Sequence, residues 1–323
     1  MAAQPLVYVH GAGPQKPASD LRDELDQIIF GRKMTTTRVA HYANVRWPAT
    51  APIGGRVPAG AGPSRQAARE KAIRSAAKPD VSPKEAAEKI VAATLAPGSR
   101  TQPTAGRTSG RAAGRAPTSP ATKEAREAAK LVEQLYRNAD RVAQRSAPGR
   151  QVGGITFPDW VFRRVVGRFA SDVVDYLYGE FTERMRAPVR QALLDGPAPG
   201  VIVAHSLGTI VLYDVLSEPA FAGFNVQQLV TVGCPLGIGN VQNRLRDAAG
   251  RPNPVPGAVK AWVNFADRFD PVALDATLRD EFSPPKNFAT DEEVNNAAKN
   301  NHDLTGYLAI EVVRSSIVDA VGQ

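Results

Sequence analysis

Short runs of apolar residues alternate along this chain with longer segments of helical periodicity. The short runs, rich in β-branched and aromatic side chains, predict strands at 6–9, 38–42, 201–204, 229–232 and 258–265. Apolar residues that recur every three or four positions predict helices at 21–29, 160–181 and 308–321. Strands that alternate with helices indicate an α/β fold with a mostly parallel sheet and helices on both faces.

Residues 51–150 depart from this pattern. Pro, Gly, Ala and Arg dominate the stretch, and its 19 Lys and Arg against 8 Asp and Glu give a formal charge of +11, compared with +8 for the whole chain. We therefore expect an N-terminal part of the core at 1–50, a basic insertion at 51–150, and the remainder of the core at 151–323. Helices are predicted at 82–95 and 122–145, whereas 98–119, which has few apolar side chains, is expected to be mobile.

The strongest chemical signal lies where the apolar run 201–204 passes through His205 and Ser206 into an immediate apolar helix. A strand, a sharp turn at serine and a helix form the nucleophile elbow of serine hydrolases. The turn needs small neighbours, which Ala204 and Gly208 supply, although glycine is commoner than alanine at the first position. The alternative, that Ser206 only caps the helix, explains neither these small residues nor the partners described next.

A serine hydroxyl needs a base, and the chain has four histidines. His10 follows the first strand, His41 lies in a strand-like run, and His205 is expected to point away from the serine. His302, in a loop before the last helix, is left as the predicted general base, although a loop histidine is more often only a solvated side chain.

The carboxylate that orients the base should follow a strand between the serine and the histidine. Asp267 and Asp270 both qualify. Asp270 precedes Pro271 in a turn with a fixed backbone, which favours it, whereas Asp267 could pair with Arg268 or cap the turn. We therefore predict that the Asp270 carboxylate lies about 2.6 to 3.2 Å from one imidazole nitrogen of His302 while the other nitrogen faces Ser206.

The oxyanion of an acyl-transfer reaction needs preorganised N–H donors. One is expected from the backbone of Leu207, directly after the nucleophile, and the other from the glycine loop after the first strand, at Gly11 and Ala12. Taken alone, this loop could equally be an ordinary tight turn.

Together these segments resemble the α/β-hydrolase superfamily, in its lipase and esterase-like branch. The resemblance covers residues 5–50 and 155–320 and includes Gly233-Cys234-Pro235-Leu236 and the chain order serine, aspartate, histidine. The basic insertion at 51–150 departs from a minimal member and lies where this family often carries a cap or lid, so the resemblance implies a cap or lid there. It implies hydrolysis of a carboxylic ester, a lipid or another acyl ester, through an acyl-serine, with neither metal nor organic cofactor. Thioesters and amides stay open because the same three side chains serve all of them.

Two other functions compete with a small-molecule esterase. A basic, partly amphipathic insertion could draw a lipase or phospholipase to an anionic membrane surface. A binding module for nucleic acid or protein on the same scaffold is less favoured, because stacking aromatics are nearly absent from 51–150 and no recognised binding motif is present. A first apolar run too short for a signal peptide predicts a cytoplasmic protein, although secretion by a route that needs no signal peptide stays open. The lone Cys234 excludes an internal disulfide.

Overall fold

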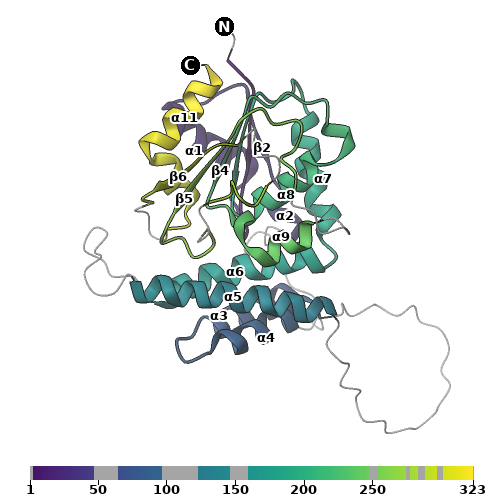
Figure 1. Ribbon diagram of the computed structural model, residues 1–323, viewed down its shortest axis with the longest axis vertical. Helices are drawn as coiled ribbons and strands as arrows, with labels where there is room; N and C mark the ends of the chain where they lie inside the picture. Colours follow the sequence, from purple (N-terminus) through teal and green to yellow (C-terminus); the bar gives the residue numbers. More distant parts are fainter. Residues whose placement is uncertain are drawn as a thin grey trace, which may run out of the picture.

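The protein is an α/β structure built on a single sheet of six parallel strands (Figure 1). The computed structural model describes residues 3–46, 65–96, 123–145, 159–246, 253–273, 277–282, 288–296 and 301–322. The strand order is β2-β1-β3-β4-β5-β6, and every neighbouring pair is parallel. The strands are β1 (Leu6–Val9), β2 (Thr37–Ala40), β3 (Val201–His205), β4 (Gln228–Val232), β5 (Trp262–Asp267) and β6 (Phe288–Val294).

The five predicted strands are present, two of them with boundaries shifted by more than one residue, and the sheet has one further strand. The run predicted at 38–42 leaves the sheet after Ala40, and the one predicted at 258–265 pairs with β4 only from Trp262 onward. The sequence pattern does not indicate β6, an edge strand that carries Asp291, Glu292 and Glu293. Charged side chains are typical of edge strands, because they discourage pairing with another chain, but they erase the apolar signal of a strand.

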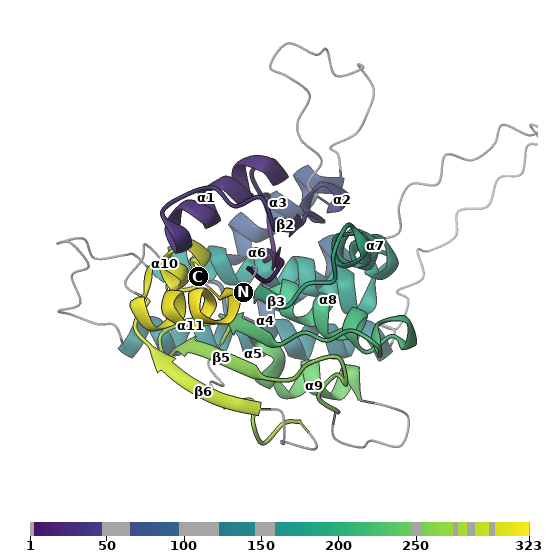
Figure 2. The ribbon, with the colours of Figure 1, turned by 90° about the horizontal axis from the view of Figure 1, so that it is seen from above.

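Helices cover both faces of the sheet (Figure 2). One face packs against α1 (Ala18–Phe30), α10 (Leu304–Ala309) and α11 (Glu311–Val321), and the other against α6 (Asp159–Tyr178), α7 (Thr182–Leu194), α8 (Leu207–Leu216) and α9 (Gly239–Leu245). Three short elements, α2 (Ala43–Arg46), η1 (Pro219–Phe221) and η2 (Pro235–Gly237), lie in the connections. The helix predicted at 308–321 is interrupted at Ile310, whose backbone is extended.

The described part of the insertion is helical. It forms α3 (Arg65–Ala76), α4 (Pro83–Thr94) and α5 (Lys123–Arg145), which pack with α6 at the end of the molecule opposite the two termini (Figure 1). Both predicted helices are confirmed, and the hydroxyl of Ser82 accepts a hydrogen bond from the N–H of Glu85 as a helix cap. The stretch predicted to be mobile, 98–119, lies outside the described residues. No helix in the described ranges is long and apolar enough to cross a membrane.

The strand order places a topological switch between β1 and β3. From β1 the chain moves outward to β2 on one side, and the next strand, β3, lies on the other side of β1. In open parallel sheets the crevice outside the carboxyl ends of the strands at such a switch is where ligands bind. In this protein the loop at 10–13 and the turn at Ser206 meet there.

Candidate active site

Ser206 occupies a strained turn between β3 and α8. Its backbone angles are φ 55° and ψ −131°, and it is the one described residue other than glycine with a positive φ. Such a conformation costs free energy and persists where the surrounding structure enforces it, often at a functional site. Gly208 explains the need for a small neighbour, because a Cβ there would lie 2.3 Å from the carbonyl oxygen of His10.

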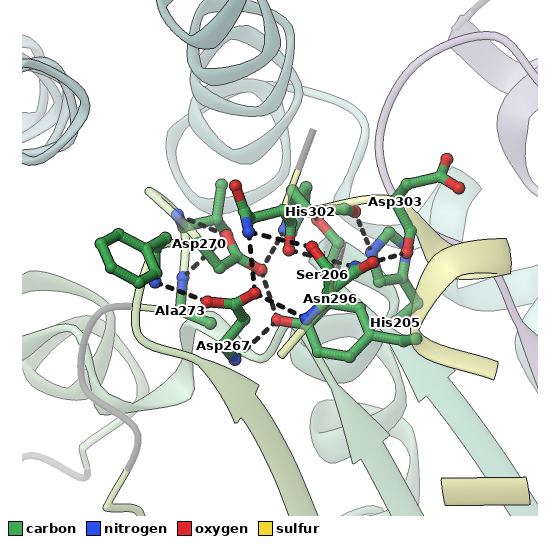
Figure 3. A network of polar contacts seen from close by, with 12 residues as sticks. His205, Ser206, Asp267, Asp270, Ala273, Asn296, His302 and Asp303 are labelled. Atoms are coloured by element: carbon green, nitrogen blue, oxygen red, sulfur yellow. Dashed lines mark hydrogen bonds and ion pairs between the residues drawn. The ribbon is translucent and has the colours of Figure 1, made fainter. Parts of the chain in front are cut away.

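His302 joins Ser206 to Asp270 through two hydrogen bonds (Figure 3). Nδ1 lies 2.7 Å from the Asp270 carboxylate, and Nε2 lies 2.7 Å from the Ser206 hydroxyl oxygen. A carboxylate accepts hydrogen bonds, so Nδ1 carries the proton and Nε2 is left to accept from the hydroxyl. All three side chains are buried, and the distances are those predicted from the sequence.

The Asp270 carboxylate is held from several sides. One oxygen accepts hydrogen bonds from the backbone N–H groups of Val272 and Ala273, at 2.8 and 3.3 Å. The other accepts from His302 and, at 2.9 Å, from the hydroxyl of Tyr307. Tyr307, on α10, is not predicted from the sequence as a site residue, and its contact fixes the carboxylate in the position that faces His302.

Asp267 has a different environment and makes no hydrogen bond to His302. Its carboxylate accepts from the backbone N–H of Phe269 at 2.7 Å, which caps the turn, and also from the N–H of Asn296 and the side-chain amide of Asn301 (Figure 3). Burial raises the pKa of this carboxyl above its ordinary value. Asp267 therefore anchors the strand end and the loop before His302, whereas Asp270 contacts the imidazole.

His205 lies closer to the site than expected. The prediction that its side chain points away is wrong, because its ring packs on His302 with centroids 4.7 Å apart and lines the same cavity as Ser206. Its Nε2 donates a 2.9 Å hydrogen bond to the backbone carbonyl of His302. Burial, followed by the proximity of His302, lowers the pKa of His205 well below 6.5. His205 thus fixes the His302 backbone without adding a charge.

The predicted oxyanion donors lie around Ser206. Leu207 is the first residue of α8, where backbone N–H groups have no partner within the helix. Gly11 packs so closely that a Cβ on it would come within 2.8 Å of the Ser206 Cβ, and Gly11 and Ala12 both line the cavity. Neither the N–H of Ala12 nor that of Leu207 has a hydrogen-bond acceptor among the described residues.

His10 orients this loop and is held as a neutral ring. Its Nδ1 donates to the carbonyl of Gly11 at 2.7 Å, and its Nε2 accepts from the N–H groups of Tyr42 and Ala43 at 3.1 and 3.3 Å. The Gly11 carbonyl and the Ala12 N–H belong to one peptide group, so fixing the first directs the second. Burial, followed by the proximity of His41, lowers the pKa of His10 to about 3. A proton on Nε2 would also face the N–H groups of Tyr42 and Ala43.

His10 should therefore make the protein less stable in acid. In the unfolded chain His10 takes up a proton below its ordinary pKa of 6.5, which the folded chain does not do until about pH 3. The free energy of unfolding should fall by about 1.4 kcal/mol per pH unit from this residue as the pH drops through that window. Urea unfolding between pH 7.5 and 4.5 measures it. His10→Gln, which cannot titrate, should show a slope shallower by that amount; an unchanged slope would refute the assignment.

A cavity of about 470 Å³ opens beside Ser206, between α1, α6 and the loops at the strand ends. Its apolar wall includes Leu21, Phe169 and Leu304, but four charged side chains also line it: Lys16, Glu24, Arg168 and Asp303. No described residue of α3, α4 or α5 lies in its wall, so the part of the insertion that is described contacts the outside of α6 and not the cavity.

Within the described ranges, no group of three or more His, Cys, Asp and Glu side chains is placed to hold a metal ion. No protein-family model matches this sequence, and neither a curated protein nor a solved structure matches it.

Proposed function

We propose that the protein is a serine hydrolase of the α/β-hydrolase type that cleaves a carboxylic ester through an acyl-serine intermediate. The observation that carries this proposal is the hydrogen-bonded series Ser206, His302 and Asp270, with the serine on a strained turn after a buried strand. A serine that only capped α8 would need neither the strained backbone nor a hydrogen bond to an imidazole that is itself hydrogen-bonded to a carboxylate.

The geometry supports a two-step reaction. The Ser206 oxygen attacks the ester carbonyl as Nε2 of His302 takes the hydroxyl proton, and Asp270 stabilises the imidazolium that forms. The N–H groups of Leu207 and Ala12 receive the negative oxygen of the tetrahedral intermediate. His302 then gives its proton to the leaving alcohol. Water, deprotonated by the same imidazole, then attacks the acyl-serine. As the carboxylic acid leaves, His302 returns this proton to the Ser206 oxygen, which restores the free serine.

The cavity favours a short or polar acyl group over a long aliphatic chain. A long chain would have to lie against Lys16, Glu24 and Arg168, and displacing water from charged groups costs free energy. Burial of each methylene of the chain would therefore contribute less binding free energy than the roughly 0.8 kcal/mol expected in an apolar site. A lipase would instead need a wide apolar wall.

A panel of p-nitrophenyl esters from acetate to palmitate tests this proposal. We expect kcat/KM to be at least about tenfold higher for butyrate than for palmitate, equivalent to about 1.4 kcal/mol in activation free energy. Ser206→Ala should abolish the activity toward every ester, whereas Ser217→Ala, a matched change at the other end of α8, should leave it intact. Hydrolysis that survives in Ser206→Ala would contradict the proposal. A rate that rises with chain length and with anionic vesicles would favour the membrane-lipase alternative.

A further inference from the structure

A buried cluster of charged side chains lies behind the loop that carries Ala12. Asp172 and Asp175 on α6 are 2% and 1% exposed, and both pair with the guanidinium of Arg46 from α2. Arg69 of α3 pairs with Asp175 at 2.6 Å. Burying this many charges is costly unless each has a partner, so such a cluster holds its members in one arrangement.

Asp172 differs from the rest of the cluster in one contact. Its Oδ2 accepts a hydrogen bond of 2.6 Å from the backbone N–H of Gly13, a residue 159 positions earlier in the sequence. Charge-assisted hydrogen bonds of this kind are short and strong. Asp175, one turn further along the same helix, pairs with the two arginines and makes no hydrogen bond to the loop at 10–13.

The Asp172 contact fixes the peptide group next to the predicted oxyanion donor. The Ala12 N–H belongs to the peptide between Gly11 and Ala12, whose carbonyl is held by His10. The following peptide, between Ala12 and Gly13, is held through its N–H by Asp172. With both neighbouring peptide groups fixed, rotation about the Ala12 backbone is restricted, and the Ala12 N–H keeps one direction.

We propose that Asp172 is a positioning residue for the oxyanion hole, through which α6 orients the Ala12 N–H without touching the substrate. This inference rests on the proposed serine hydrolase. Asp172 does not line the cavity, so it should contribute little to substrate binding. An oxyanion donor acts chiefly in the transition state, so loss of its orientation lowers kcat rather than raising KM.

The test compares four proteins: wild type, Asp172→Ala, Asp172→Asn and the matched control Asp175→Asn. Asp172→Ala should lower kcat for a short-chain ester about 100-fold, the scale of a small misplacement of a catalytic group, with KM within about twofold. Phosphonylation of Ser206 by a fluorophosphonate, which also forms charge on oxygen, should slow by a similar factor. Asp172→Asn keeps an oxygen that can accept from Gly13, so it should recover part of the loss. Asp175→Asn should lower the thermal midpoint but keep kcat within about twofold of wild type.

The outcomes separate this inference from the function on which it rests. If the wild-type protein is neither labelled by the fluorophosphonate nor active on the ester, the proposed serine hydrolase function is refuted. If wild type is labelled and active but Asp172→Ala and Asp172→Asn match it, the positioning role is refuted. Equal losses of kcat in the Asp172 and Asp175 variants would also refute it, because they would indicate general damage to α6. Should Asp172→Ala fail to fold, Asp172→Asn with Asp175→Asn gives the same comparison.

Discussion

His302→Ala should lower kcat for ester hydrolysis about 10⁶-fold, the scale for removing the base of a serine-hydrolase triad. Nε2 of His302 lies 2.7 Å from the Ser206 oxygen, and no other imidazole among the described residues hydrogen-bonds that hydroxyl. Without the base, the serine proton has no acceptor, and the hydroxyl is a weak nucleophile at neutral pH. Steady-state hydrolysis of p-nitrophenyl butyrate measures the loss, with circular dichroism to verify the fold.

His41→Ala provides the control for His302→Ala. His41 lies outside the cavity and contacts the backbone carbonyl of Lys16 at the surface, so the same substitution there should change kcat little. An active His302→Ala enzyme would mean that another group takes the proton, and His205, whose tilted ring packs against His302, would then be the first to examine.

Asp270→Asn should chiefly lower kcat, whereas Asp267→Asn should chiefly lower the free energy of unfolding. Asp270→Asn should reduce kcat by up to about 10,000-fold, because it removes the charge that stabilises the imidazolium and the acceptor that holds its tautomer. Asp267→Asn should leave kcat of the folded enzyme within a few fold but should destabilise it by about 1 to 3 kcal/mol, since its single oxygen cannot accept both from Phe269 and from Asn296 and Asn301. Both kcat and urea unfolding are needed for each variant.

The comparison is informative because both substitutions change one aspartate to asparagine and lie three positions apart. General damage to the loop would affect the two variants alike. If instead Asp267→Asn is the inactive enzyme and Asp270→Asn keeps its rate, the orienting carboxylate is Asp267, and the hydrogen bond of Asp270 to His302 is only structural.

Local patterns explain why much of the site could be predicted from the sequence. The elbow at Ser206 is contiguous, so a strand, a turn and a helix with small neighbours are all visible within a dozen residues. Asp270 is favoured by the turn it forms with Pro271, and the structure confirms that its carboxylate contacts His302. The helix after Ser82 is likewise encoded locally, by a cap and a regular apolar face.

The remaining features depend on contacts between distant segments. Tyr307 reaches Asp270 over 37 positions, and Asp172 reaches Gly13 over 159. Such contacts leave no periodic pattern in the local sequence. Asp172 and Asp175, which stand among the apolar residues of α6, are a local indication of a buried polar contact there. The ring of His205 could not be placed, because its direction depends on how the His302 loop packs. The edge strand β6 was missed because its charges mask the strand pattern.

Covalent trapping of Ser206 tests the central claim most directly. The folded wild-type protein would be incubated with a fluorophosphonate, and the modified residue would be located by mass spectrometry of tryptic peptides. The proposed activation of the serine by His302 predicts one adduct on Ser206, formed quickly in wild type, slowly in His302→Ala and not at all in Ser206→Ala. A folded wild-type protein that stays unmodified, or a Ser206→Ala variant that is still labelled at the same rate, would contradict the assignment of Ser206 as the nucleophile.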